Sequence, residues 1–265
     1  MLQITHLSKL FHPGSVDEKI ALINVNLQLK PGDFVTVIGS NGAGKSTLMN
    51  MISGALKPDS GTVHIAGNDI TDLSEHKRSR WVGRVFQDPM AGTAPHMTIE
   101  ENLAMAYSRG KRRGLSIGIN SGRRELFQEQ LRKLGIGLEN RLRAKVGTLS
   151  GGERQALSLL MATFTEPQIL LLDEHTAALD PARAELVTQL TQKIVSELKL
   201  TTLMVTHNME QAIRLGNRLI MMDGGRIILD IHEQEKQRLT IEGLLGEFEQ
   251  ISGHKLSDDR VVLGS

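Results

Sequence analysis

The chain has 265 residues, enough for one large domain, or a core with a small subdomain, that buries a sizeable apolar interior. It has no cysteine, which excludes disulfides, thiolate zinc sites and a cysteine nucleophile, and its formal net charge of +1 gives no strong field that would draw it onto nucleic acid or acidic lipid. It has no signal-like start and no run of roughly 20 apolar residues, so we expect a soluble, non-secreted protein that reaches a membrane only through partners.

Short apolar runs rich in Val, Ile and Leu alternate with helical stretches, which is typical of a parallel sheet covered by helices. These runs are FVTVIG at 34–39, VGRVFQ at 82–87, ILLLDE at 169–174, TTLMVTH at 201–207 and RLIMMDGGRIIL at 218–229. Gly224 and Gly225 inside the last run predict a hairpin. The first residues and GTVHIAG at 61–67 predict strands of a more antiparallel edge. We therefore expect an α/β fold with a mainly parallel sheet and an antiparallel β annex.

The segment GSNGAGKST at 39–47 matches the phosphate-loop pattern G-x-x-x-x-G-K-[ST], between the strand FVTVI and the helical LMNMISGAL. Backbone N–H groups and the helix N-terminus would cradle phosphates, Lys45 would reach the β- and γ-phosphates, and the Ser46 hydroxyl would bind Mg²⁺. The alternative is a Gly-rich turn without a ligand. The predicted nucleotide-binding residues of the loop are Gly39, Ser40, Asn41, Gly42, Ala43, Gly44, Lys45, Ser46 and Thr47.

Between about residues 90 and 150 the strand pattern lapses, and TIEENLAMAYSRG and RRELFQEQLRKLGI show helical spacing of apolar residues. We interpret 90–149 as a helical subdomain inserted into the core. Its basic run at 108–114 has no interleaved aromatic residues for base stacking, which favours a solvated linker over a nucleic-acid or lipid contact. At its end, Ser150 and Glu153 of TLSGGERQ match a capping box at a helix start.

Two adjacent acids, Asp173 and Glu174, end the apolar run in ILLLDEHTAALDP at 169–181. They could simply be polar residues at which a strand stops. Ligands of open α/β sheets, however, bind beyond the carboxyl ends of the strands. If Ser46 holds magnesium, Asp173 is placed to complete the metal shell. Glu174, on the opposite face of the extended chain, could then orient or deprotonate the water that attacks the γ-phosphate.

The order of phosphate loop, Gln87, LSGGE, LLLDE, ALD and His207 resembles the nucleotide-binding subunit of ATP-binding cassette (ABC) transporters. The resemblance covers roughly 1–230 and implies one RecA-like P-loop NTPase domain, with a core at 1–89 and 150–230 and the helical subdomain at 90–149. The remaining 231–265 would form a short tail with one helix near 241–251.

In that family two such domains sandwich two ATP molecules, with Mg²⁺, head to tail. The resemblance then implies that Ser150, Gly151, Gly152 and Glu153 face the ATP held by the partner's Lys45, where a helix N-terminus favours an anion.

The resemblance implies further roles for single residues. Gln87 would contact Mg²⁺ or the attacking water, Asp180 would lie in a loop that crosses the dimer interface, and His207 would touch the γ-phosphate. Phe11 is the candidate aromatic that stacks on adenine, with a packing role as the alternative.

Two departures from the family pattern stand out. Most relatives have proline where His175 stands, and a basic ARA where this chain has LLMATF at 159–164. His175 could tune Glu174 as an imidazolium, or it could be a neutral surface substitution, and we favour the second.

The resemblance implies an ATP-hydrolysing homodimer at the cytoplasmic face of the cell membrane, bound there through integral-membrane permease subunits. The motif variants resemble a bacterial importer subgroup that serves an extracellular substrate-binding lipoprotein, with aromatic amino acids among the cargoes. Alternatives are the ATPase of an exporter or a soluble ABC ATPase of iron–sulfur assembly. ABC ATPases that act on nucleic acid would need a second phosphate loop, zinc-binding cysteines or a long coiled coil, and this sequence has none of them.

We expect Met90, Pro95 and Met97 to form an apolar patch that receives a short helix of the permease.

Overall fold

The computed structural model describes residues 1–110 and 118–252, which belong to two compact units. The first unit comprises Met1–Arg78 and the chain from Lys199 onward, and the second comprises Ser79–Leu198. Most of the basic run at 108–114 and all of the polar end at 253–265 lie outside the described residues. Among the described residues no helix is long and apolar enough to cross a membrane.

The central strand of the first unit is β3 (Phe34–Gly39), which is buried along its whole length. It pairs in parallel with β8 (Thr201–Val205) on one side and β9 (Arg218–Asp223) on the other. Beyond β9 lies β10 (Arg226–His232), antiparallel to β9. The chain turns between these two strands at Gly224 and Gly225, both at positive φ, so the predicted hairpin is confirmed.

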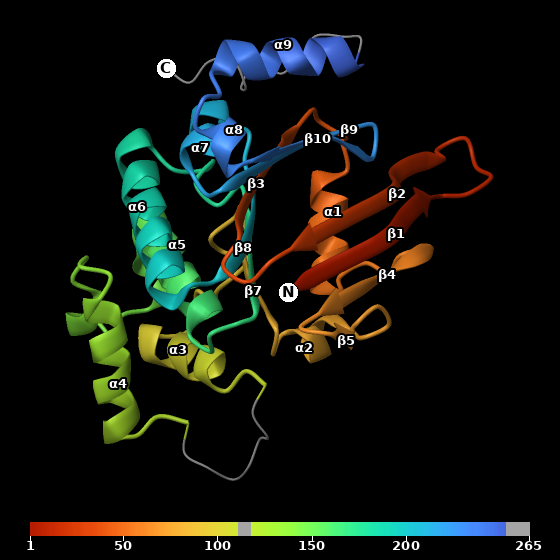
Figure 1. Ribbon diagram of the computed structural model, residues 1–265. Helices are drawn as coiled ribbons and strands as arrows, with labels where there is room; N and C mark the ends of the chain where they lie inside the picture. Colours follow the sequence, from red (N-terminus) through yellow and green to blue (C-terminus); the bar gives the residue numbers. More distant parts are fainter. Residues whose placement is uncertain (111–117, 253–265) are drawn as a thin grey trace. The chain divides into compact units, whose positions relative to one another are not determined.

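A separate antiparallel sheet of the first unit has the strand order β2-β1-β4-β5 (Figure 1). Its strands are β1 (Leu2–Phe11), β2 (Lys19–Leu29), β4 (Ser60–Ile65) and β5 (Asn68–Asp69). This sheet is the predicted β annex. The helices of this part of the unit are α1 (Lys45–Ser53) and the short α2 (Glu75–Arg78). Arg78 is fully buried and donates hydrogen bonds to backbone carbonyls at the end of α1.

The C-terminal part of the first unit contains α7 (Met209–Arg214), α8 (Glu233–Lys236) and α9 (Ile241–Ser252). Leu244 and Phe248, four residues apart on α9, are fully buried in an apolar cluster with α7, β9 and β10. The Lys236 ammonium donates to the carbonyls of Leu215 and Gly216 just after α7, and burial lowers its pKa to about 8. The predicted tail helix is thus confirmed, and it is packed onto the core.

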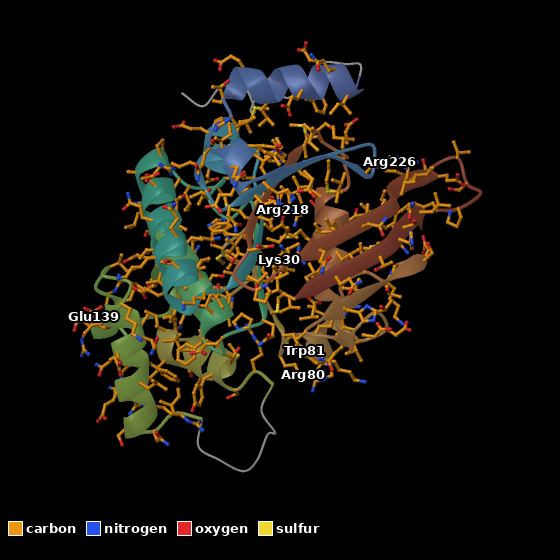
Figure 2. All side chains as sticks on the ribbon, in the orientation of Figure 1. Lys30, Arg80, Trp81, Glu139, Arg218 and Arg226 are labelled. Carbon is orange, nitrogen blue, oxygen red and sulfur yellow. The ribbon has the colours of Figure 1, made fainter. Side chains whose placement is uncertain are left out.

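The second unit is built on the parallel pair β6 (Val82–Val85) and β7 (Ile169–Asp173). Helices α5 (Gly151–Thr163) and α6 (Pro181–Leu198) lie side by side in this unit (Figure 1). A Cβ added to Gly83 would lie 2.5 Å from the Ala162 carbonyl oxygen, so only glycine lets β6 come this close to α5. Next to β6, the Arg80 guanidinium lies over the Trp81 ring at 3.6 Å from its centroid (Figure 2).

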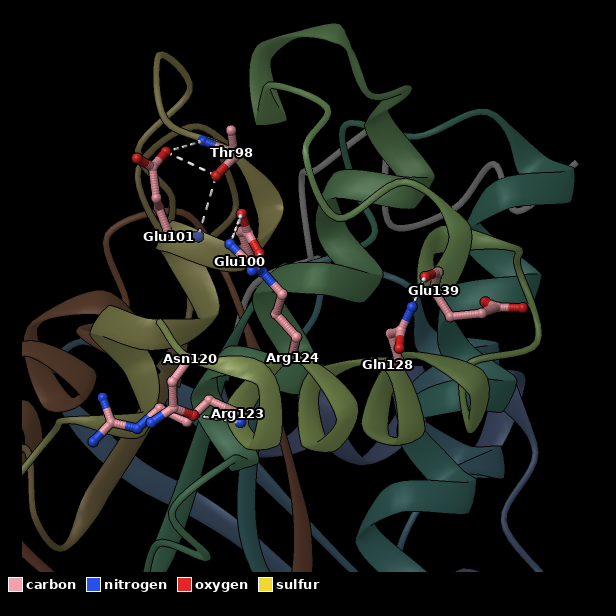
Figure 3. A network of polar contacts seen from close by, with 8 residues as sticks. All are labelled: Thr98, Glu100, Glu101, Asn120, Arg123, Arg124, Gln128 and Glu139. Carbon is pink, nitrogen blue, oxygen red and sulfur yellow. Dashed lines mark hydrogen bonds and ion pairs between the residues drawn. The ribbon is translucent and has the colours of Figure 1, made fainter. Parts of the chain in front are cut away.

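The predicted helical insert contains α3 (Ile99–Tyr107), α4 (Ser121–Arg132) and two 3₁₀ turns, Leu138–Asn140 and Val146–Thr148. Thr98 and Glu101 form a capping box at the start of α3, and Asn120 caps α4 (Figure 3). Arg124 of α4 donates to Glu100 of α3 at 2.7 Å and so ties the two helices together (Figure 3).

Candidate functional site

The loop at 39–47 has a backbone that only glycine can form at several positions. Gly39, Gly42 and Gly44 have φ values of 149°, 84° and 101°. A Cβ on Gly39 would lie 2.0 Å from the Met222 carbonyl oxygen, and one on Gly44 would lie 2.5 Å from that of Ala21. Gly39 and Gly44 are therefore required by the close approach of β9 and β2 to the loop, whereas Gly42 is favoured by its positive φ alone.

Helix α1 begins directly after this loop. Its N-cap is Gly44, and no side chain caps the helix there. The amides of its first turn therefore keep their capacity to donate to an anion. Lys45 is only 5% exposed, and its ammonium donates to the carbonyls of Gly39 and Ser40 at 2.7 and 2.9 Å. The ammonium thus lies against the loop, while Ser46 is exposed beside it.

The carboxyl ends of β3, β8 and β9 bring further polar groups to this edge. Ser40 donates to Asp223 at 2.7 Å. His207 follows β8 by two residues, between Thr206, which is buried, and Asn208, which caps α7. The parallel register of β3 and β8 places His207 and the phosphate loop at the same end of the sheet.

Sequence reasoning missed Lys19. Strand pairing sets Lys19 opposite Phe11, and the Lys19 ammonium lies 3.8 Å from the position of a Cβ on Gly42. A cation therefore lies over the phosphate loop, beside the candidate adenine-stacking ring. No motif marks this residue, because the contact depends on the pairing of β1 with β2.

In the second unit, α5 begins at the segment that carries the family signature. Ser150 accepts a hydrogen bond from the Glu153 amide and the Glu153 carboxylate accepts one from the Ser150 amide, so the predicted capping box is confirmed. Desolvation raises the pKa of Glu153, but hydrogen bonds from Ser150 and the guanidinium of Arg141 outweigh it and lower that pKa.

The two glycines of the signature lie against the loop that contains Asp180. A Cβ on Gly151 would lie 3.1 Å from Leu179, and one on Gly152 would lie 3.2 Å from Arg183. Asp180 accepts a hydrogen bond from the Arg183 amide at the start of α6. The structure therefore brings the signature and the Asp180 loop together within one unit.

Gln87 is exposed just beyond β6, and α5 holds the chain on both sides of it. Gln155, which is buried, donates to the Phe86 carbonyl at 3.0 Å. Gly92 lies so close to Ser158 that a Cβ there would be 2.6 Å from its hydroxyl. Sequence reasoning missed Gln155, although it stands two residues after LSGGE.

The acids at the end of β7 differ in their surroundings. Asp173 accepts a hydrogen bond from Arg84 on β6 at 2.8 Å through its Oδ2 oxygen. Glu174 has a φ of 45°, so the expectation of an extended chain at this residue is wrong. The reason is that the chain reverses directly after β7, with the Ala177 amide donating to the Glu174 carbonyl at 2.9 Å.

The residues predicted to hold Mg²⁺ are suited to it by their donor chemistry. Ser46, Gln87 and Asp173 offer only oxygen ligands, which Mg²⁺ prefers. No cluster of three or more His, Asp or Glu side chains that could hold a metal occurs among residues 1–110 and 118–252.

His175 is not a surface residue, since it is only 1% exposed. Burial lowers its pKa from 6.5 to about 4, so the imidazole is neutral at pH 7. The expected surface location is therefore wrong, whereas the neutral charge expected with it agrees with the lowered pKa. The interpretation as an imidazolium that tunes Glu174 is wrong because the ring is neutral. The ring lies against α6, with Nε2 at 3.0 Å from the Thr191 hydroxyl.

We expect a His175→Gln variant to be less sensitive to acid than the wild type. The folded chain keeps His175 neutral down to about pH 4, whereas the unfolded chain protonates it near pH 6.5. Above pH 6.5 the titration of His175 therefore does not lower the free energy of unfolding. As the pH falls from 6.5 towards 4, it lowers this free energy by about 3 kcal/mol in total. Denaturant titrations at about pH 7 and about pH 4.5 measure the free energy of unfolding. An equal fall for both proteins would contradict a buried neutral imidazole.

The predicted site residues thus form two groups. Those of the first unit are Phe11, the loop at 39–47 and His207. Those of the second unit are Gln87, the signature at 150–153, Asp173, Glu174 and Asp180. Ser46 belongs to the first unit and Asp173 to the second, so the expectation that they share one metal ion stays a prediction.

Known proteins resemble the chain along nearly its whole length. The family profile described as ABC transporter matches residues 22–177. The chain is 46% identical over 249 residues to the tyrosine transport ATP-binding protein of Clostridioides difficile (strain R20291), covering 94% of this chain and 99% of that protein. It is 32% identical over 248 residues to the energy-coupling factor transporter ATP-binding protein EcfA2 of Clostridium perfringens (strain 13 / Type A), covering 91% and 84%.

A solved dimeric structure of an ATP-binding cassette, in a post-hydrolysis state with ADP and phosphate, superposes with a TM-score of 0.75 at 31% identity, covering 88% of this chain and 99% of that one. The resemblance inferred from the motifs is thereby confirmed. The chain belongs to the ABC transporter family, as an ATP-binding and ATP-hydrolysing subunit with the P-loop NTPase fold.

Proposed function

We propose that this chain powers an importer whose cargo is an aromatic amino acid, with tyrosine as the first candidate. The observation that carries the proposal is the 46% identity with a tyrosine transport ATP-binding protein, over 94% of this chain and 99% of that protein. More distant relatives include proteins named for choline transport and for spermidine/putrescine import. In such systems the cargo is selected by other subunits, so the cargo assignment rests on this relative.

In this proposal the first unit holds the nucleotide. Lys45 and the N-terminus of α1 bind the β- and γ-phosphates, Phe11 stacks on adenine, and His207 contacts the γ-phosphate. The uncapped start of α1 and the position of Lys45 against the loop support these roles. The Lys19 ammonium over Gly42 would add a second cation for the phosphates.

The second unit would supply the chemistry and the dimer contacts. Asp173, Gln87 and Ser46 would hold Mg²⁺, which would neutralise phosphate charge, and Glu174 would activate the attacking water. Ser150 and the amides of Gly151 and Gly152 contact the ATP of the second subunit, with the Asp180 loop beside them. The contacts of Leu179 and Arg183 with these glycines support a single surface for both elements.

ABC ATPase subunits dimerise and work with membrane permease subunits. For this chain we infer a homodimer at the cytoplasmic face of the membrane, with an extracellular substrate-binding lipoprotein acting through the permease. The test is ATPase activity of this chain assembled in vesicles with the permease that co-purifies with it and with the candidate lipoprotein. Tyrosine-loaded lipoprotein should raise the rate several-fold, with leucine as the matched control. Equal rates with both would overturn the aromatic cargo.

We expect charge in the apolar segment after Gln87 to separate ATP hydrolysis from transport. Met90 is 41% exposed there, while Pro95 and Met97 are half-buried. A permease helix packed on these side chains would be disrupted by Met90→Glu or Met97→Glu, because a carboxylate would be buried without a partner. ATPase activity of the isolated subunit should stay near wild type, while co-purification with the permease and uptake are lost.

Met105→Glu is the matched control for this experiment. Met105 is 47% exposed on α3, outside the segment, so its substitution should leave assembly unchanged. Normal assembly of both segment variants would place the docking surface elsewhere. Loss of ATPase activity in the isolated Met90→Glu protein would indicate core packing instead.

A further inference from the structure

We propose that His175 is a positioning residue, whose neutral imidazole fastens the turn after β7 to helix α6 and thereby fixes the backbone of Glu174. The inference rests on the proposed role of Glu174 as the residue that activates water. His175 is the next residue in the chain, and its side chain is buried against α6.

The hydrogen-bond network decides which imidazole nitrogen carries the proton. The Thr191 hydroxyl has one hydrogen, which it donates to the Val187 carbonyl at 2.8 Å. We assign Nε2–H as the donor in its contact with Thr191 at 3.0 Å, because the opposite tautomer would bury an Nδ1–H without an acceptor. Nδ1 then carries no proton, and within the described part of the chain this buried atom has no hydrogen-bond partner. An imidazolium would bury a second N–H without an acceptor, so the neutral ring is the form that fits.

The anchor on the other side of this bond is rigid. Thr191 lies inside the 18-residue helix α6 and is fully buried, and the bond joins it to a residue 16 positions earlier in the chain. The turn between them needs such an anchor because Glu174 adopts a φ of 45°. A residue with a Cβ is strained in this left-handed region, and it stays there only if its surroundings fix it.

Proline would act differently at position 175. It would offer no donor to Thr191, and it restricts the preceding residue to extended conformations. Such a restriction conflicts with the φ of 45° at Glu174. The side-chain bond of His175 to α6 therefore holds a turn that a proline at this position would disfavour.

The test compares variants that remove the bond with one that restores it. His175→Leu removes the donor and Thr191→Val removes the acceptor, while each keeps a side chain of similar size. We expect kcat for ATP to fall about tenfold in both, because the base is misplaced by a fraction of an ångström to about 1 Å. The Kd for ATP should stay within about twofold, since nucleotide binding does not depend on this turn. His175→Gln carries an amide donor near the Nε2 position and should restore kcat to within about threefold.

A double variant, His175→Leu with Thr191→Val, should be no slower than either single variant, because both remove the same bond. Normal kcat in the two single variants overturns the proposal. A loss of ATP binding that parallels the loss of kcat also overturns the proposal, as does a failure of His175→Gln to restore kcat. Either result indicates that His175 acts through packing alone. Glu174→Gln in the same assay separates the two hypotheses. Full turnover in Glu174→Gln would overturn the role of Glu174 in activating water. Slow turnover in Glu174→Gln together with a normal kcat in His175→Leu would overturn only the positioning role of His175.

Discussion

Lys45→Ala is expected to abolish tight ATP binding, with a Kd raised at least about 100-fold. Lys45 supplies the ammonium that lies against the loop at 39–47, and it is held there by the carbonyls of Gly39 and Ser40. In the proposed phosphate loop, its removal would take away a charge-assisted contact to the phosphates. Titration of the purified variant with ATP and Mg²⁺ by calorimetry measures the loss.

Lys57→Ala is the matched control for this variant. Lys57 belongs to the same unit, and its ammonium lies at the surface, 3.5 Å from Asp72. The control should bind ATP as the wild type does, and thermal unfolding should show that both variants are folded. ATP affinity of Lys45→Ala within a few-fold of wild type would contradict the phosphate-loop assignment.

Glu174→Gln is expected to keep ATP and Mg²⁺ while turnover falls by roughly 10²- to 10⁴-fold. The amide cannot take a proton from water, whereas Asp173 remains and is still oriented by Arg84. Asp173→Asn should behave differently, because weaker Mg²⁺ binding would raise the metal concentration needed for half-maximal activity. Steady-state ATPase rates at several Mg²⁺ concentrations distinguish the two variants. Ordinary turnover in Glu174→Gln would move the base elsewhere, with His207 as the next candidate.

Features set by local sequence could be predicted well. The phosphate loop could be predicted because its backbone path requires glycine at set positions. The run FVTVIG predicts a strand buried on both faces, as β3 is. The capping box at Ser150 and Glu153 is likewise a four-residue signal that needs no distant partner. The hairpin at Gly224 and Gly225 belongs to the same class.

Features set by distant neighbours could not be predicted from the sequence. A left-handed glutamate has no local signal, so the turn at Glu174 was missed. The buried position of His175 against Thr191, which stands 16 residues later, likewise has no local signal. The pairing of Arg84 with Asp173 required the parallel register of β6 and β7. In hindsight, the arginine within the apolar run VGRVFQ is the one available signal.

The central claim is that ATP joins two copies of this chain head to tail, each signature closing on the ATP of the other subunit. Light scattering of purified Glu174→Gln with and without ATP tests it most directly, because slow hydrolysis preserves the ATP-bound state. We expect the molar mass to double when ATP is added, and a chain that also carries Ser150→Arg to stay monomeric although ATP still binds. A monomer that carries bound ATP, or a Ser150→Arg chain that dimerises as readily, would contradict it.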